Sequence, residues 1–272
     1  MSIFQAIFLG FLQGLTEFLP VSSSGHLVLA QKIMGISEPT LLFDILLHVG
    51  TLVAVLVVLW KDVWALLKQP VQRLTGFIIL GTIPTVIIAL LFEKTIEEAF
   101  SSGAFLGMGF LLTTVLLLVA EKLSERRKIG RAESEMKYTD ALLIGTLQGV
   151  AIFPAVSRSG STIAGALGVG LNREFAARFS FLMAIPAILG ALVLQLQDLI
   201  SAMNAHDTEA LFGGIGLPAI MAGTVTAALV GIFAVRFMLA LIKNKNLKGF
   251  ALYTGILGLL VLADQNLFHL FF

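Results

Sequence analysis

The segment GFLQGLTEFLPVSSSG, residues 10–25, recurs as GTLQGVAIFPAVSRSG at residues 145–160. Nine of the 16 positions are identical without a gap at a constant offset of 135 residues, among them a glutamine, two serines and three glycines. Shared hydrophobic composition does not produce such a match. The sequence therefore predicts two related halves, at about residues 1–122 and 138–272, joined by a linker at about 122–138.

The composition indicates an integral membrane protein with a single membrane domain. Of the 272 residues, 57% are hydrophobic and 13% are charged, whereas soluble proteins average about 45–50% apolar and about 25% charged residues. The absence of cysteine excludes disulfides and thiolate metal sites, and a net charge of +1 gives no support for nucleic-acid binding. The opening residues, MSIFQAIFLG, carry no cation before the apolar run, so we expect no cleavable signal peptide.

Two apolar regions differ from ordinary membrane-spanning helices. Residues 3–34 and 139–170 are each interrupted near the middle by proline, glycine and serine. Because unpaired backbone groups cannot face lipid, such breaks must be enclosed by protein or line a wet cavity. We predict two re-entrant helical hairpins here. Six other stretches reach the roughly 20 residues that a spanning helix needs, and they lie at 42–60, 75–92, 104–120, 179–197, 217–240 and 250–271.

The cations support the re-entrant arrangement. If both hairpins return to the side that they entered from, 14 cations fall on one side of the membrane and only Lys32 and Lys94 on the other. If the hairpins crossed the membrane instead, most of this bias would be lost. By the positive-inside rule the cation-rich side is cytoplasmic, so both termini are expected outside. The 14 cations are Lys61, Lys68, Arg73, Lys122, Arg126, Arg127, Lys128, Arg131, Lys137, Arg173, Arg178, Lys243, Lys245 and Lys248.

The expected fold is therefore all-α and integral to the membrane, with six transmembrane helices and two re-entrant helical hairpins. Each half has three crossings, which is an odd number, so the halves form an inverted-topology repeat. In such repeats, binding sites lie where the broken helices meet. Gene duplication alone would account for the shared serines and glycines. It does not account for the polar groups that only one half has, which are Glu17 and His26 in the first half and Arg158 in the second.

The first break combines a carboxylate with a new helix start. Gln13 and Glu17 are four residues apart and share one face of a helix. Pro20 interrupts that helix, and Ser22 and Ser24 are expected to cap the next one. The free N–H groups and positive dipole at such a helix start form a ready anion site.

The second break, SRSGST at residues 157–162, repeats this arrangement and adds Arg158. Arg158 is the only cation that the predicted topology places deep in the membrane, where a charge costs about 2.5–3.5 kcal/mol on insertion scales. We expect Glu17 to be its counter-charge. Guanidinium groups bind phosphate in a bidentate manner, so the combined site predicts an anion with several oxygens, such as phosphate. A purely structural ion pair, and capping or packing roles for His26 and the serines, are the alternatives.

The same residues permit chemistry on a phosphate. Ser23 is a candidate nucleophile if His26 or Glu17 accepts its proton, and attack by water is the alternative. Glu17 and Gln13 are candidate ligands of a divalent cation. No Walker motif is present. His48, with Asp44 four residues before it, is a weaker candidate for facing the site, whereas a solvated surface is expected for His206, Asp207 and Glu209. The candidate substrate-binding residues are Ser22, Ser24, Gly25, Ser157, Ser159, Gly160 and Thr162.

Two stretches, QGLTEFLPVSSSGH at 13–26 and PAVSRSGSTIAG at 154–165, closely resemble the two signature motifs of the bacterial undecaprenyl-diphosphate phosphatases, the bacitracin-resistance family. The resemblance extends along the whole chain. It implies a multi-pass enzyme of the bacterial plasma (inner) membrane that hydrolyses undecaprenyl diphosphate to the monophosphate and inorganic phosphate. This reaction recycles the lipid carrier for cell-wall synthesis, confers bacitracin resistance and uses a divalent cation, Mg²⁺ or Ca²⁺.

The resemblance also implies roles for individual residues. The family's acidic motif falls on Gln13 and Glu17, and Gln13 departs from members that have glutamate there. Ser24 stands where many members have threonine. The serine–histidine motif falls on Ser22, Ser23 and His26, and the phosphate-binding motif falls on Ser157, Arg158, Ser159 and Thr162.

A transporter or flippase for a polyprenyl phosphate, or for another phosphorylated lipid, is the alternative function, because inverted repeats with broken helices are common in transporters. A purely structural membrane scaffold would not explain a buried arginine and glutamate. The expected partners are a polyprenyl diphosphate substrate, membrane lipid and a second copy of the chain in a homo-oligomer.

Overall fold

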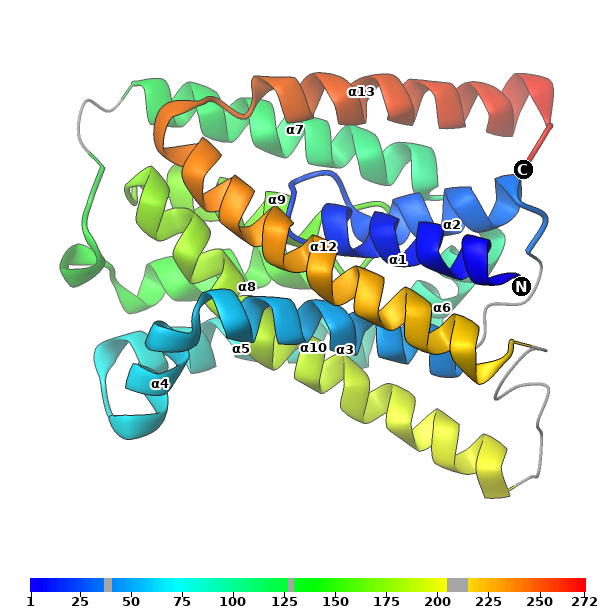
Figure 1. Cartoon of the computed structure of the whole chain (residues 1–272). Coiled ribbons are helices and arrows are strands. Elements are labelled where there is room, and N and C mark those ends of the chain that lie inside the picture. The colour runs from blue at the N-terminus through cyan, green and yellow to red at the C-terminus, as the bar shows by residue number, and fades with distance from the viewer. Residues whose placement is uncertain (37–40, 127–129, 205–214) are drawn as a thin grey trace.

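A computed structural model describes residues 1–36, 41–126, 130–204 and 215–272. These parts of the chain are helical, and their β-structure is limited to an isolated bridge between Arg131 and Leu171 (Figure 1). The helices are α1 (Ile3–Thr16), α2 (Ser23–Ile33), α3 (Leu41–Val58), α4 (Trp60–Lys68), α5 (Arg73–Leu91), α6 (Glu93–Ser102), α7 (Leu106–Glu125), η1 (Glu133–Glu135), α8 (Tyr138–Val150), α9 (Arg158–Gly168), α10 (Arg173–Asn204), α12 (Leu217–Asn244), α13 (Lys248–Ala263) and the π-helical turn η2 (Asp264–Phe268).

Five helices in the described residues are long and apolar enough to cross a membrane. They are α5, α7, α10, α12 and α13, and each coincides with a predicted stretch. The remaining predicted stretch, 42–60, corresponds to α3, which passes the same test only together with α4. These two helices meet at an angle of 81°. The fold is thus an all-helical bundle with five or six candidate membrane spans.

The last span matches the predicted stretch 250–271 to within a few residues. α13 ends at Ala263, and the π-helical turn η2 continues the candidate span to Phe268. Beyond it, the carboxylate of Asp264 accepts hydrogen bonds from the backbone N–H groups of Leu270 at 2.9 Å and Phe271 at 3.0 Å. These bonds hold the final residues against the end of the helix.

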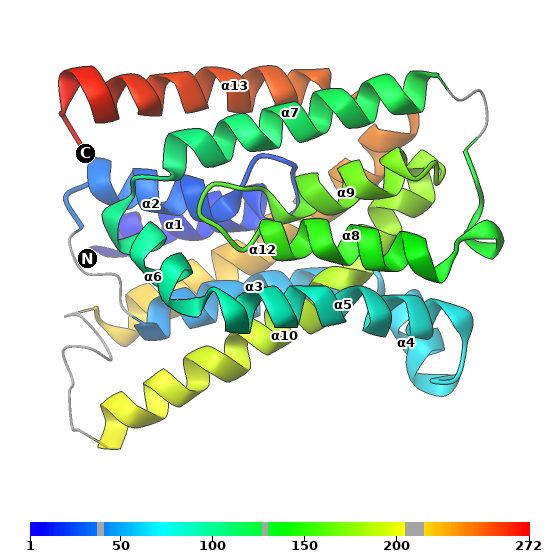
Figure 2. The same cartoon turned by 180° about the vertical axis from the view of Figure 1, so that it is seen from behind.

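Two helix pairs are interrupted inside the bundle. α1 begins beside the N-terminus and its partner α2 returns toward the same end, whereas α8 begins at the opposite end of the molecule and α9 returns there (Figures 1 and 2). The connecting segments, residues 17–22 and 151–157, lie in the interior rather than at either end. These are the two breaks that the repeated segment predicts.

Glycines let each hairpin approach a helix of the other half very closely. A methyl group added at Gly10 of α1 would lie 2.2 Å from the carbonyl oxygen of Gly223 in α12, and one added at Gly145 of α8 would lie 1.9 Å from that of Gly81 in α5. No side chain fits at either crossing, so the backbones touch directly. Gly10 and Gly145 are equivalent in the repeat, and their two crossings are built in the same way.

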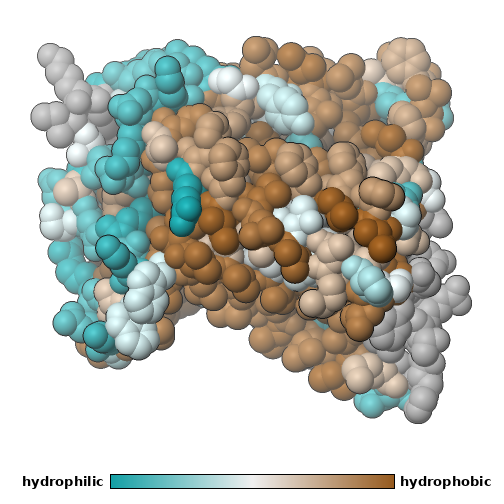
Figure 3. Space-filling model, viewed as in Figure 1, coloured by the Kyte–Doolittle hydropathy of each residue, from teal (hydrophilic) through white to brown (hydrophobic). Residues whose placement is uncertain are grey.

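Hydrophilic residues gather at one end of the molecule, on the left in Figure 3, and apolar side chains cover most of the remaining visible face. The hydrophilic end contains α4 and the ends of the linker, and both termini lie at the other end (Figure 1). Arg127 and Lys128 lie outside the described residues, as do His206, Asp207 and Glu209. Ion pairs at the hydrophilic end include Arg131–Asp140, Arg173–Glu121, Arg178–Asp62, Lys243–Glu174 and Lys248–Glu125.

One arginine besides Arg158 lies in a predicted apolar region, near the end of a stretch rather than deep within it. Arg236 lies in the predicted stretch 217–240, and its side chain is exposed on α12. It precedes the end of α12 at Asn244 by eight residues, roughly 12 Å along a helix. A long cationic side chain at that depth can extend to the polar end of the protein. Arg158, by contrast, is enclosed by protein, with a side-chain exposure of 15%.

Candidate active site at the two helix breaks

The first break is closed by Ser22, as predicted for a cap. Its hydroxyl oxygen accepts a hydrogen bond from the backbone N–H of Gly25 at 3.3 Å. Ser22 has a φ of 72°, a left-handed conformation that is rare for residues other than glycine and marks strained, functional segments. The prediction that Ser24 is also a cap is wrong. Ser24 lies within the first turn of α2, with its hydroxyl 3.3 Å from that of Ser22.

The second break is closed in the same way by Ser157, which accepts the N–H of Gly160 at 3.0 Å. It is anchored to its surroundings by α7, because the N–H of Ser157 donates to the hydroxyl of Thr113 at 2.9 Å. The two breaks also touch each other. The hydroxyl of Ser159 donates to the carbonyl oxygen of Leu19 at 2.9 Å, so the repeat places both helix starts side by side.

The carboxylate of Glu17 joins the two hairpins. Its Oε1 accepts Arg158 Nη2 at 2.6 Å, and its Oε2 accepts the hydroxyl of Ser23 at 2.6 Å. Gln13 Nε2 donates to the same Oε2 at 3.2 Å. The ion pair predicted between Glu17 and Arg158 is therefore present, and the Glu17 side chain is only 7% exposed. Ser23 and Arg158 are equivalent in the repeat, and each is the first residue of its helix.

Several buried polar atoms around this carboxylate have no partner. Nη1 of Arg158 is a donor without an acceptor, and Oε1 of Gln13 is an acceptor without a donor. The fully buried hydroxyl of Ser161 is also unpartnered. Buried groups of this kind cost free energy unless something pairs with them. Arg158 Nη1, a donor in the first residue of α9, could pair with an oxygen of an anionic ligand, whereas Gln13 Oε1, an acceptor, could pair only with a donor or a cation.

His26 lies close to this site but does not contact Ser23. Its Nδ1 is 2.6 Å from the carbonyl oxygen of Ser22, and its Nε2 is 2.6 Å from the hydroxyl of Tyr253 in α13. Phe110 packs edge-on against the imidazole, with ring centroids 5.5 Å apart. Tyr253 belongs to no motif and lies 227 residues from His26, so nothing in the sequence could identify this contact.

His48, the weaker sequence candidate, lies on α3. Its imidazole interacts electrostatically with the carboxylate of Glu17. Its Nδ1 is 2.9 Å from the backbone carbonyl oxygen of Asp44, and Oδ1 of Asp44 is buried without a partner. Thr162, the remaining candidate, bonds to the hydroxyl of Ser180 at 2.6 Å, and its hydroxyl therefore anchors α9 to α10.

The donor atoms suit a weakly held hard cation. Among the described residues, no group of three or more His, Cys, Asp or Glu side chains could hold a metal ion. The site offers two candidate ligands, the single carboxylate of Glu17 and the unpartnered amide oxygen of Gln13. Mg²⁺ characteristically uses one or two carboxylates and takes its other ligands from water and substrate phosphates. The residues present fit that pattern and do not form a complete protein cage.

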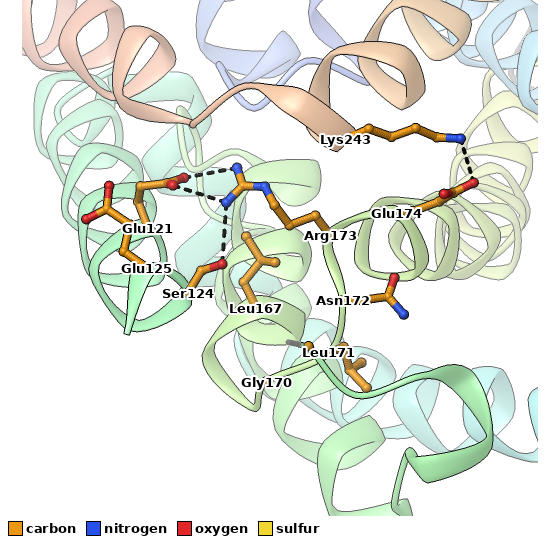
Figure 4. Close-up of a pocket in the computed structure, with 11 residues that line it drawn as sticks. Glu121, Ser124, Glu125, Leu167, Gly170, Leu171, Asn172, Arg173, Glu174 and Lys243 are labelled. Carbon is orange, nitrogen blue, oxygen red and sulfur yellow. Dashed lines mark hydrogen bonds and ion pairs between the residues drawn. The ribbon is translucent and has the colours of Figure 1, made fainter. Parts of the chain in front are cut away.

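A separate hollow lies at the hydrophilic end and has a structural explanation. It has a volume of about 450 Å³. Figure 4 shows Arg173 pointing at Glu121 and Ser124, while Lys243 reaches across to Glu174. Arg173 also donates to the carbonyl oxygens of Ile242 at 3.0 Å and Lys245 at 2.8 Å. Arg173 therefore joins the start of α10 to α7 and to the α12–α13 corner, the turn at residues 242–248 that connects these two helices.

Comparison with known proteins identifies the family of the chain. Residues 6–260 match the family described as bacitracin resistance protein BacA. A protein of Carboxydothermus hydrogenoformans named undecaprenyl-diphosphatase is 49% identical over 266 residues, which cover 97% of this chain and 98% of that relative. A relative from Halothermothrix orenii, also named undecaprenyl-diphosphatase, is 42% identical over 98% of this chain and 100% of its own length. A relative from Bacillus thuringiensis, named undecaprenyl-diphosphatase 4, is 42% identical over 97% of this chain and 98% of its own length. The chain therefore belongs to the BacA family.

Proposed function

We propose that this protein hydrolyses undecaprenyl diphosphate to undecaprenyl monophosphate and inorganic phosphate. The observation that carries the proposal is the geometry of Arg158. One of its nitrogens is held by Glu17, and Nη1 is buried and unpartnered between two helix N-termini. A terminal phosphate supplies the oxygens that these donors lack. The names and full-length similarity of the relatives support the lipid diphosphate as the substrate.

Substrate binding is proposed to use donors from both hairpins. Arg158 and the first turns of α2 and α9 hold the phosphate oxygens. Ser22 and Ser157 fix those turns through their caps on Gly25 and Gly160. Ser24, Ser159 and Thr162 complete the polar lining. This arrangement stabilises the negative charge that develops as the phosphoryl group transfers.

Ser23 is the proposed nucleophile, with Glu17 as the base. The hydroxyl of Ser23 donates to Glu17 Oε2, so the carboxylate is placed to accept its proton. A bond forms between Ser23 Oγ and the terminal phosphorus while the bond from that phosphorus to the bridging oxygen breaks, and the bridging oxygen leaves with undecaprenyl monophosphate. Water then releases inorganic phosphate from Ser23, which regains a proton. Direct attack by water held at Glu17 and Ser23 is the alternative, and His26 is proposed to carry a proton to or from the site.

A divalent cation, Mg²⁺ or Ca²⁺, is proposed to bind at Glu17 and Gln13. When bound, it would neutralise charge on the phosphate oxygens. Gln13 supplies its free Oε1 while its Nε2 keeps the Glu17 carboxylate in place. Gln13 is an amide rather than a second carboxylate. The protein therefore contributes one negative charge to the cation, that of Glu17, and the phosphates of the substrate contribute the remaining negative charge.

The membrane arrangement is also proposed. The opposite entry of the two hairpins and their matching glycine crossings support an inverted-topology repeat of six spans and two re-entrant hairpins. The cation-rich end is proposed to face the cytoplasm of a bacterial cell, which leaves both termini outside the plasma membrane. Formation of a homo-oligomer remains a prediction.

Replacing Arg158 or Glu17 by alanine is expected to lower phosphate release from undecaprenyl diphosphate about a hundredfold or more, because each removes a charge that the transition state needs. Purified variants in detergent, where transport cannot be scored, provide the measurement. Arg236→Ala and Glu97→Ala, both exposed residues, are the matched controls. Near-normal turnover in both site variants would contradict the proposal, and wild-type protein that binds the lipid without releasing phosphate would favour a transporter or flippase.

A phosphoserine at Ser23 is expected when the enzyme is quenched with acid during turnover of substrate labelled in its terminal phosphate. Peptide mass spectrometry locates the label. Ser23→Ala should abolish the label and nearly all turnover, because the nucleophile is lost. The exposed Ser101→Ala serves as the control and should keep both. If no phosphoenzyme forms and Ser23→Ala retains turnover within tenfold of wild type, water rather than Ser23 attacks the phosphorus.

Chelation of divalent cations is expected to stop phosphate release, and Mg²⁺ or Ca²⁺ should restore it. Gln13→Glu should lower the cation concentration for half-maximal rate by roughly tenfold, because affinity rises with the charge of the ligands. Gln148 is equivalent to Gln13 in the repeat, and its amide donates to the hydroxyl of Thr85. The control Gln148→Ala should therefore leave the cation concentration for half-maximal rate unchanged. Full activity in excess chelator would refute the cation site.

A further inference from the structure

Both nitrogens of the His26 imidazole are engaged, and the partners decide which nitrogen carries the proton. The carbonyl oxygen of Ser22, 2.6 Å from Nδ1, can only accept a hydrogen bond. A neutral imidazole has one N–H and one lone pair, so the proton of neutral His26 lies on Nδ1. Nε2 then presents its lone pair, and the hydroxyl of Tyr253, 2.6 Å away, must be the donor.

The imidazole is held on further sides as well. Its plane lies within 11° of the Tyr253 ring plane, with centroids 5.6 Å apart. The ring of Phe110 packs edge-on against it. Tyr253 is fixed in turn by its helix, because the next residue, Thr254, shares a hydrogen bond of 2.8 Å with Thr114 of α7. The hydroxyl of Tyr253 is therefore presented to Nε2 by a braced helix.

Tyr253 also stands between the site and the outside of the bundle. Its side chain is 47% exposed, while His26 is only 8% exposed. Both line a mainly apolar cavity of about 520 Å³ between the first hairpin and the α12–α13 corner, with Lys245 at its wall. The tyrosine therefore meets His26 Nε2 at the wall of this cavity.

We infer that Tyr253 is a positioning residue for His26: its hydroxyl holds the imidazole in the orientation and tautomer in which Nδ1 carries the proton and Nε2 the lone pair. The inference rests on the proposed function for its effect on turnover. Such supporting partners fix the orientation of functional histidines and can be as important as the histidines themselves.

The test compares the two tyrosines of the chain. Tyr253→Phe removes only the hydroxyl, and Tyr138→Phe is the matched control because Tyr138, the first residue of α8, packs on Phe77 rather than on His26. We expect Tyr253→Phe to lower kcat for phosphate release roughly 10–100-fold. KM should stay unchanged, because Tyr253 does not contact the proposed phosphate donors. Tyr138→Phe should leave both unchanged, and equal unfolding temperatures would exclude a general loss of structure.

Nitrogen NMR of histidine-labelled protein provides the readout that does not depend on turnover. The His26 signals are assigned by their loss in His26→Gln. Wild-type protein should show a protonated Nδ1 and a hydrogen-bonded lone pair on Nε2, and Tyr253→Phe should shift Nε2 toward a lone pair without a donor. A protonated Nε2 in neutral wild-type His26, or unchanged Nε2 and kcat in Tyr253→Phe, would overturn the inference. If the wild type released no phosphate, the proposed function would fail while the NMR result would still decide the role of Tyr253.

Discussion

The carboxylate of Glu17 is the group on which the arrangement of both hairpins depends. It is almost fully buried and accepts hydrogen bonds from Ser23 and Arg158, the first residues of α2 and α9. Removing one partner of a buried ion pair typically costs about 3–5 kcal/mol, because the other charge is left uncompensated. The pair therefore forces residues 141 positions apart in the chain to stay together. It also leaves Arg158 Nη1 free for a ligand.

The rest of the fold makes that contact possible. The glycine crossings at Gly10 and Gly145 bring each hairpin directly against the backbone of the other half. Serine caps start both inner helices, and Ser159 links the second start to the loop of the first. At the hydrophilic end, Arg173 fastens three segments through Glu121 and the carbonyl oxygens of the α12–α13 corner. α13 begins just after that corner and carries Tyr253, whose hydroxyl meets His26.

Local patterns predict local features of this protein well. Hydropathy located the spans, and the repeated segment located both breaks, the caps at Ser22 and Ser157 and the ion pair between Glu17 and Arg158. These features depend on a few neighbouring residues or on a repeat that can be seen by alignment. The prediction that Ser24 is a cap was wrong because a single residue caps this helix start. Ser22 does so with a left-handed backbone, and Ser24 lies in the first turn of α2.

Contacts between distant helices could not be predicted, because they follow from how the bundle packs. Tyr253 looks like one more aromatic residue of an apolar span until α13 is placed beside α2.

The most direct test of a single shared site is a double-mutant cycle on kcat/KM for phosphate release with Glu17→Gln, Arg158→Gln and the double variant. Residues that act as one unit are strongly non-additive, so the double variant should lose about as much activity as the worse single variant. Losses that multiply independently would show that Glu17 and Arg158 do not form one catalytic unit.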